Sequence, residues 1–352
     1  MMNEIVTALK NFFHASDEIQ ADLSERWRPH SNRRTTIVFA IVGIFVILLY
    51  VFAIRPPDDF PLDELVTIPA GSTLTAAAKL LKENDVVRSA WVLRALVIVM
   101  GHEKTIHAGD YLFKEPKDVF VVARAISIGA FGLEPARVRI PEGATTKQMA
   151  IILRGPLKRF NEDRFLATAS PLEGYLFPDT YFFLPNTTED TAIQAMRQNF
   201  DHHMNAPIEG YGSTTLAELI RKSGKSEEDI VILASIIERE ARNTKDRRLI
   251  SGVLWNRLAK DMPLQVDVTF LYTLGKGTFQ LTTKDLVTDS PYNTYINKGL
   301  PPTPIGSPSL DSLIAAAMPT KHTYLFFLAD HSGITHFCKD FACQQANKDR
   351  YF

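Results

Sequence analysis

The feature that most constrains how this chain folds is an unbroken apolar stretch near its N-terminus. Residues 37–54, IVFAIVGIFVILLYVFAI, carry no charged side chain. A helix rises ~1.5 Å per residue, so this stretch covers most of a ~30 Å hydrocarbon core. It is too long, and begins too far from Met1, for a cleaved signal peptide. We therefore predict a transmembrane helix over 37–54, in preference to a helix buried in a soluble core.

The charges on the two sides of this helix predict its orientation. Arginines without an intervening acid precede the helix: Arg26, Arg28, Arg33 and Arg34. Acids follow it: Asp58, Asp59, Asp63 and Glu64. Because positive residues stay on the cytoplasmic side, residues 1–36 are expected to form a cytoplasmic tail, and the rest of the chain to lie outside the cytoplasm. Residues 55–63, with three prolines and three acids, are predicted to be a linker.

Composition excludes several classes of protein. Lys plus Arg (39) and Asp plus Glu (40) nearly cancel, and there is no basic run, so no nucleic-acid partner is expected. A chain of 352 residues allows two or three domains. It contains no HExxH, G-x-S-x-G or P-loop motif. No cofactor is predicted.

The only two cysteines, Cys338 and Cys343, leave two alternatives. With His331 and His336 they form H-x4-H-x-C-x4-C, which has the ligand types of a zinc site. The spacing lacks a CxxC-like pair, however, and a disulfide is favoured outside the cytoplasm. We predict a Cys338–Cys343 disulfide and no metal.

The chain contains an internal repeat. Residues 66–81, VTIPAGSTLTAAAKLL, align without gaps on residues 138–153, VRIPEGATTKQMAIIL. In each copy a short alternating strand stops at Pro-x-Gly, and a threonine follows that can cap a helix. Residues 108–113 read as a turn entering a strand that could pair with the first copy. The repeat therefore predicts a strand–turn–helix unit that is used twice.

A strand–helix–helix–strand module of this pattern resembles the LysM fold, which binds the sugar backbone of peptidoglycan or chitin. We assign residues 64–156 to this LysM-like module. Pro-x-Gly is also good turn chemistry in its own right, so sugar binding by the module and a purely structural role remain equal alternatives.

A helix predicted over Ser226–Arg242 carries the strongest candidate site, ILASIIEREARN at 232–243. Ser226 with Asp229 gives its N-terminal capping pattern. At about 100° per residue, Glu238 and Glu240 point in nearly opposite directions. Small residues lie on the face of Glu238, which leaves room for a ligand, and neighbouring apolar bulk would raise the pKa of its carboxyl. A general acid has those requirements.

A simpler interpretation is a surface helix end at which Glu238 pairs with Arg242 in the next turn. Spacing alone favours that pair, because such pairs are common on helices.

The order of blocks around this helix, however, resembles the YceG-like (MltG) endolytic murein transglycosylases. The blocks are EGYLFPDTY, LASIIEREA, RRLISGVLWNRL, MPLQVDVTFLY, SPYNTYINKGLPPTPI and LDSLIAAAMPTKHTYLFFLAD. The similarity covers about residues 64–352, and the family layout includes a membrane anchor.

The resemblance implies that Glu238 is the catalytic residue and Glu240 a structural carboxylate. Such enzymes cut the β-1,4 bond between N-acetylmuramic acid and N-acetylglucosamine within peptidoglycan strands and leave 1,6-anhydro ends. The implied location is the bacterial inner membrane with the enzyme in the periplasm, where peptidoglycan synthases or division proteins are candidate partners. A non-catalytic peptidoglycan-binding or scaffold protein is the alternative.

Weaker predictions concern substrate binding. Gln265 and Asp267, alternating with Leu264 and Val266, could face a cleft from one strand. Further candidates for sugar contacts are Glu173, Tyr175, Tyr292, Asn293 and Tyr295. Each could instead be a polar residue that holds a loop, and this role is favoured for the tyrosines, because buried tyrosines commonly bond the backbone.

The expected fold class is α+β: one N-terminal transmembrane helix, the LysM-like small α+β module, and a larger α/β catalytic domain over 157–352. The chain departs from the family pattern at Val268, Thr303 and Ser309, where the family usually has Pro, Gly and Gly. We expect these departures to affect turns and substrate register and to leave the acid untouched.

Overall fold

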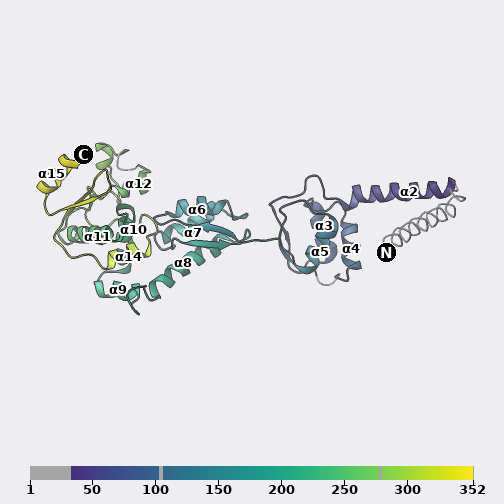
Figure 1. Ribbon diagram of the computed structural model, residues 1–352, viewed down its shortest axis with the longest axis horizontal. Coiled ribbons are helices and arrows are strands. Elements are labelled where there is room, and N and C mark those ends of the chain that lie inside the picture. The colour runs from purple at the N-terminus through teal and green to yellow at the C-terminus, as the bar shows by residue number, and fades with distance from the viewer. Residues whose placement is uncertain (1–32, 103–105, 277–279, 352) are drawn as a thin grey trace, which may run out of the picture. The chain divides into compact units, whose positions relative to one another are not determined.

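A computed structural model describes residues 33–102, 106–276 and 280–351 (Figure 1). Most of the predicted cytoplasmic tail, residues 1–32, lies outside this range. By its internal contacts the chain forms two units, one ending at Gly132 and the other spanning Leu133–Phe352. Each unit combines helices with small antiparallel sheets, which confirms the α+β class.

The apolar stretch is helical, as predicted. Helix α2 (Arg33–Leu49) continues into a π-helical turn over Tyr50–Ile54. Within the described residues, one helix is long and apolar enough to cross a membrane, Thr36–Ile54, with a mean hydropathy of 3.2. Almost all of its side chains are exposed, as expected for a helix whose natural surroundings are lipid.

The first unit has a β–α–α–β order followed by a third helix. Strand β1 (Leu65–Ile68) pairs antiparallel with β2 (Gly109–Leu112), as the sequence predicted. Helices α3 (Leu74–Glu83) and α4 (Ala90–Val99) lie between them in the chain, and α5 (Val119–Ile128) follows. The predicted linker packs on this unit, because Phe60 is buried in its core and Arg88 donates to the Pro56 carbonyl.

The second copy of the repeat belongs to the second unit. It forms β3 (Ala136–Arg139) and α6 (Thr146–Arg154), with Thr145 as the N-cap of α6. Strand β3 pairs with β4 (Thr180–Phe183), and α6 packs on α7 (Glu162–Ala169). Because of these contacts the second copy belongs with the residues that follow it, and the first unit ends at Gly132. The sequence placed the boundary between the module and the catalytic domain at 156/157. Helix α8 (Glu189–Asn205) completes this apolar core.

A second core in the same unit surrounds the helix that carries Glu238. Helix α10 (Glu227–Glu240) packs against α11 (Thr244–Ala259) and α14 (Leu310–Ala317). Three further helices are α9 (Leu216–Ser223), α12 (Val268–Leu274) and α13 (Thr283–Leu286). Strand β5 (Phe326–Ala329) pairs with β6 (Thr335–Cys338), and α15 (Phe341–Tyr351) ends the described chain.

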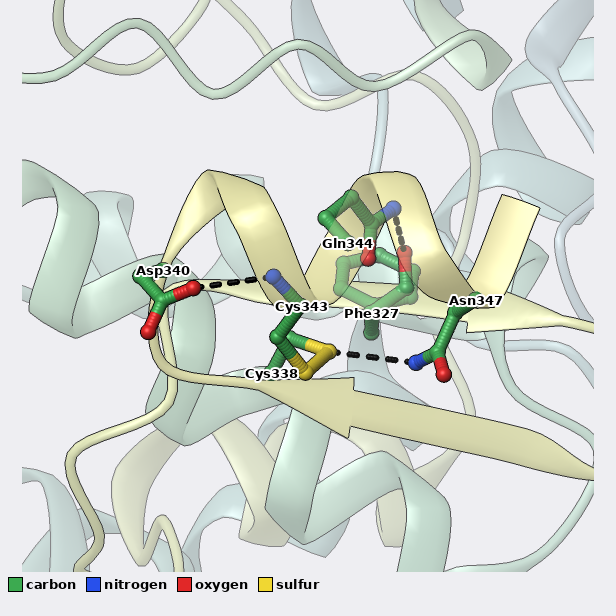
Figure 2. Close-up of a disulfide and its surroundings, with 6 residues drawn as sticks. All are labelled: Phe327, Cys338, Asp340, Cys343, Gln344 and Asn347. Carbon is green, nitrogen blue, oxygen red and sulfur yellow. Dashed lines mark hydrogen bonds between the residues drawn. A yellow bond between two sulfur atoms is a disulfide. The ribbon is translucent and has the colours of Figure 1, made fainter. Parts of the chain in front are cut away.

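The predicted disulfide between Cys338 and Cys343 is present (Figure 2). It joins the end of β6 to the first turn of α15, where the Asn347 amide donates to the Cys338 sulfur at 3.1 Å. Gln344 on the same helix donates to the Phe327 carbonyl of β5 at 3.2 Å. The bond therefore fastens α15 to its hairpin and uses both thiols of the alternative zinc site.

The segment that leads into α14 ties the second repeat turn to α10. The Ile305 amide donates to the Ser235 hydroxyl in the middle of α10 at 3.0 Å. Ser307 exchanges two backbone hydrogen bonds with the repeat turn, donating to the Ala144 carbonyl and accepting from the Gly143 amide. Gly306 lies between these contacts with φ +151°, and a β-carbon there would be 2.5 Å from the Gly143 oxygen.

We expect Gly306→Ala to destabilise the protein much more than Gly210→Ala. Both glycines have positive φ, so alanine strains the backbone at each by about 1–2 kcal/mol. A β-carbon at Gly210 meets nothing within 4 Å, whereas at Gly306 it meets fixed backbone and adds about 1–3 kcal/mol. Thermal unfolding of both full-length variants measures the difference. Equal losses of stability would contradict this close contact.

Candidate active site

Helix α10 is buried along most of its length and emerges only at its last turn. The Ser226 hydroxyl accepts from the Asp229 amide and begins the helix, and acids fill the first turn, where the helix dipole favours them. Every residue from Ile230 to Ile237 is buried. Glu238 and Glu240 follow at the C-terminal end and are partly buried. The packing of an apolar helix thus positions both carboxylates rigidly.

Glu238 is held by polar partners from two other helices. Its Oε1 accepts from Arg247 Nη2 of α11 at 3.1 Å. Its Oε2 accepts from the Ser309 amide at 2.8 Å and from the Ser309 hydroxyl, at the N-terminus of α14. The side chain is only 7% exposed. Glu238 therefore pairs with Arg247 and not with Arg242. Its carboxylate is surrounded by hydrogen-bond donors, whereas the sequence predicted apolar surroundings.

Arg247 is shared between two carboxylates. Its Nη1 donates to Asp311 Oδ2 of α14 at 2.9 Å, and the Thr244 hydroxyl donates to the same oxygen. Arg247 is only 17% exposed, and the two carboxylates compensate its charge where water is largely excluded. The network joins α10, α11 and α14 at the point where Glu238 leaves the core.

A cavity of about 400 Å³ opens beside Glu238. One wall is the second repeat turn, Pro141–Ala144, and another is the face of α6 that carries Gln148 and Ile151. Arg239 Nη2 donates to the Gly143 carbonyl at 2.7 Å and fixes the turn against the end of α10. The candidate acid therefore lines a space large enough for a small ligand.

Glu173 lies on the other side of Arg239. It is 5% exposed and accepts from the Thr146 amide and from the Thr146 hydroxyl, the latter at 2.9 Å. Burial raises the pKa of Glu173, while the Thr146 donors and the charge of Arg239 act in the opposite direction. Its contacts anchor the start of α6, so Glu173 supports the cavity wall.

Asp267 lies close enough to Glu240 for its charge to act on it, and the predicted strand over Gln265 and Asp267 does not form. Residues 262–266 are irregular, with Leu264 and Val266 buried and Gln265 at φ +54°. The Gln265 amide oxygen accepts from Arg257 at 2.6 Å, and the Asp267 carboxylate accepts from the Tyr295 hydroxyl at 2.5 Å. Burial, with a smaller contribution from the charge of Asp267, raises the pKa of Glu240 to about 7.

The remaining candidates make contacts that hold loops or cores. Asn293 is 1% exposed and donates to the carbonyls of Leu286 and Thr288. The Tyr292 hydroxyl bonds the Thr303 hydroxyl at 2.7 Å. The Tyr175 ring lies 5.3 Å from that of Phe200, under the Arg197 guanidinium. Within the described residues, these three side chains bond or pack against residues other than Glu238.

Sequence reasoning missed the residues that contact Glu238. Ser309 departs from the family pattern, and from the sequence we expected this change to affect only a turn. That expectation is wrong, because the Ser309 amide and hydroxyl both donate to Glu238. Arg247 stands in the block RRLISGV, but nine positions separate it from Glu238, which no helix periodicity connects. Thr303 lies at a bend, as expected, whereas Val268 is the first residue of α12.

Comparisons with known proteins agree with one another. A family model described as the YceG-like family matches residues 66–350. A Bacillus subtilis protein named endolytic murein transglycosylase is 34% identical over 313 residues, covering 81% of this chain and 84% of its own length. A Streptococcus pneumoniae protein of the same name is 39% identical over 164 residues, which is 28% of its length.

A solved structure is also similar. The 2.6 Å crystal structure of a putative yceG-like protein from Listeria monocytogenes has 32% sequence identity and a TM-score of 0.54. The match covers 81% of this chain and 98% of that one.

The raised pKa of Glu240 predicts a pH-dependent stability. Between its ordinary pKa of 4.5 and about 7, the folded protein keeps a proton that the unfolded chain releases, so stability falls as pH rises through this window. Glu240→Gln removes the titration and should gain about 1–3 kcal/mol relative to the native chain between pH 5 and pH 8.

The measurement is thermal unfolding of the full chain in detergent at both pH values. Glu227→Gln is the matched control, since Glu227 lies exposed in the first turn of the same helix. An equal pH response in the native chain and Glu240→Gln would show that Glu240 does not titrate in this range.

Proposed function

The chain belongs to the YceG-like family, and we propose that it cuts murein glycan strands internally, as a lytic transglycosylase in which Glu238 is the catalytic residue. The observation that carries this assignment is the position of Glu238. It lies at the end of a buried helix, borders a cavity of about 400 Å³, and is oriented by fixed donors.

One carboxyl group is sufficient for the proposed reaction. Glu238 donates a proton to the glycosidic oxygen as the bond from this oxygen to C1 of N-acetylmuramic acid breaks. The 6-hydroxyl of the same sugar then bonds to C1, and Glu238 accepts its proton. The product is a 1,6-anhydro end, and no water is consumed. An ordinary glycosidase would require a second carboxyl to serve as nucleophile or to activate water.

The partners of Glu238 suit the second half of this cycle. Arg247 and Ser309 donate to the ionised carboxylate, which is the form that remains after the first proton transfer. In this form the group can act as a base for the 6-hydroxyl. Their fixed geometry also keeps the carboxyl in one orientation while the proton leaves and returns.

The first unit and the apolar helix define the setting that we propose. The β1–α3–α4–β2 order, with the two strands paired, supports a LysM-like module in this unit. Its sugar binding, the periplasmic location of the enzyme and contacts with synthases or division proteins are proposals that rest on the sequence. The relatives carry an enzyme's name, so the enzyme is favoured over a non-catalytic scaffold.

We expect the full chain in detergent to release fragments with 1,6-anhydro ends from purified peptidoglycan. Glu238→Gln should lower this rate by about 10²- to 10⁴-fold, because the amide cannot exchange the proton. Glu227→Gln, on the exposed first turn of α10, should retain the native rate. Products are identified by mass spectrometry.

Two results would contradict this proposal in different ways. Activity that survives in Glu238→Gln would reject the choice of residue. Reducing ends from the native chain would indicate hydrolysis and a second carboxyl, for which Glu142 is the first candidate because it lines the same cavity.

The proposed orientation predicts that a C-terminal tag is digested by protease added to spheroplasts, whereas an N-terminal tag is protected until the membrane is ruptured. The arginines before α2 are the physical reason. A protected C-terminal tag in intact spheroplasts would reverse the orientation.

A further inference from the structure

A second cavity, of about 350 Å³, adjoins the residues that hold Glu238. Glu142 lines both cavities. Ser309, whose amide and hydroxyl bond Glu238, and Asp311, which pairs with Arg247, line the second cavity. The candidate acid therefore lines the first cavity itself, and its partner Ser309 lines the second.

An aromatic pair forms an apolar surface in the second cavity. The rings of Phe177 and His203 are stacked, with centroids 4.0 Å apart and planes inclined by 23°. Phe177 is buried, and its amide donates to the Met196 carbonyl at 3.1 Å. His203, in the last turn of α8, is only partly buried, so its ring is the outer layer of the stack.

The surroundings of His203 favour its neutral imidazole. Burial lowers the pKa of His203, the neighbouring His202 lowers it further, and Asp179 acts in the opposite direction. A neutral ring presents a flat face without the hydration that a cation would keep. His202 is exposed, whereas His203 is partly buried and lines the second cavity.

Carboxylates border this aromatic face. Asp179 accepts from the Thr180 amide at 2.6 Å and from the Asn199 side chain at 3.0 Å, which fixes its position. Asp311 is fixed by Arg247 and Thr244. Each carboxylate oxygen has two lone pairs, so acceptor capacity remains at both groups for ligand hydroxyls. A flat apolar face with fixed acceptors at its edge suits a pyranose ring, which has C–H groups on its faces and hydroxyls around its rim.

We propose that the second cavity binds one N-acetylhexosamine unit of the glycan strand, with a sugar face against His203. This unit lies across the cleaved bond from the sugar in the cavity beside Glu238. The inference rests on the proposed function and deepens it. The glycan strand would run from one cavity to the other, past Glu142 and Ser309. His203 is then a binding residue that takes no part in the proton transfers.

The test compares two substitutions of similar size at His203. His203→Phe keeps an aromatic face on Phe177, whereas His203→Leu fills the space without one. His202→Leu is the matched control, since His202 is the exposed neighbour on the same helix. Each change is made in the full chain carrying Glu238→Gln, and binding to peptide-free glycan strands is measured in detergent. Thermal unfolding establishes that all variants are folded.

We expect His203→Leu to weaken glycan binding about five- to tenfold and His203→Phe to change it less than about twofold. His202→Leu should bind as the parent does. In chains with Glu238 intact, His203→Leu should raise KM by the same factor and leave kcat within about twofold, because no contact of Glu238 is altered.

Equal affinities of His203→Leu and His202→Leu would overturn the assignment of this cavity. Equal losses in His203→Leu and His203→Phe would overturn the role of the aromatic face. Both comparisons measure binding alone, so they can be made even if the native chain releases no anhydro ends. The absence of anhydro ends would reject the proposed function and not the sugar-binding role of the second cavity.

Discussion

The organisation of the second unit follows from the need to keep a carboxylate stable at the end of a buried helix. Glu238 leaves the core with little exposure to water, and a charge in that position requires partners. Arg247 from α11 and the start of α14 at Ser309 supply them. The N-terminal end of α14 also carries the positive end of its dipole, which favours an anion there. Three helices are thus joined by one carboxyl group, and the cavities open around that junction.

Sequence patterns predicted what depends on neighbours along the chain. Apolar runs, caps and turn residues gave the membrane-spanning candidate, α10 with its Ser226 cap, the β1–β2 pairing and the α+β class. These features depend on periodicity and local hydrogen bonding, which a sequence displays directly. The Cys338–Cys343 bond belongs to the same group, since only two thiols were available.

The partners of Glu238 could not be predicted in this way, because they depend on tertiary packing. Arg242 is the neighbour by helix spacing, but α10 ends before it, and Arg247 reaches the carboxylate from the next helix. The alternation of Gln265 and Asp267 did predict which side chains leave the core, yet the backbone there is irregular, and the charge of Asp267 acts on Glu240. The sequence also predicted a structural role for Glu240. Glu240 is not among the residues that line the cavity beside Glu238, and its role stays a prediction.

The repeated strand–turn–helix unit shows how a site can be added to a scaffold. The first turn, Pro69–Gly71, has open space at Gly71, whereas the second is pressed between Arg239 and Ser307. At matching offsets, the cavity residues Glu142, Gln148 and Ile151 replace Ala70, Ala76 and Lys79 of the first copy. The first copy can therefore be compared directly with the second, within one protein. The two copies share the strand–turn–helix fold, and the positions at which they differ include residues that line the cavity beside Glu238.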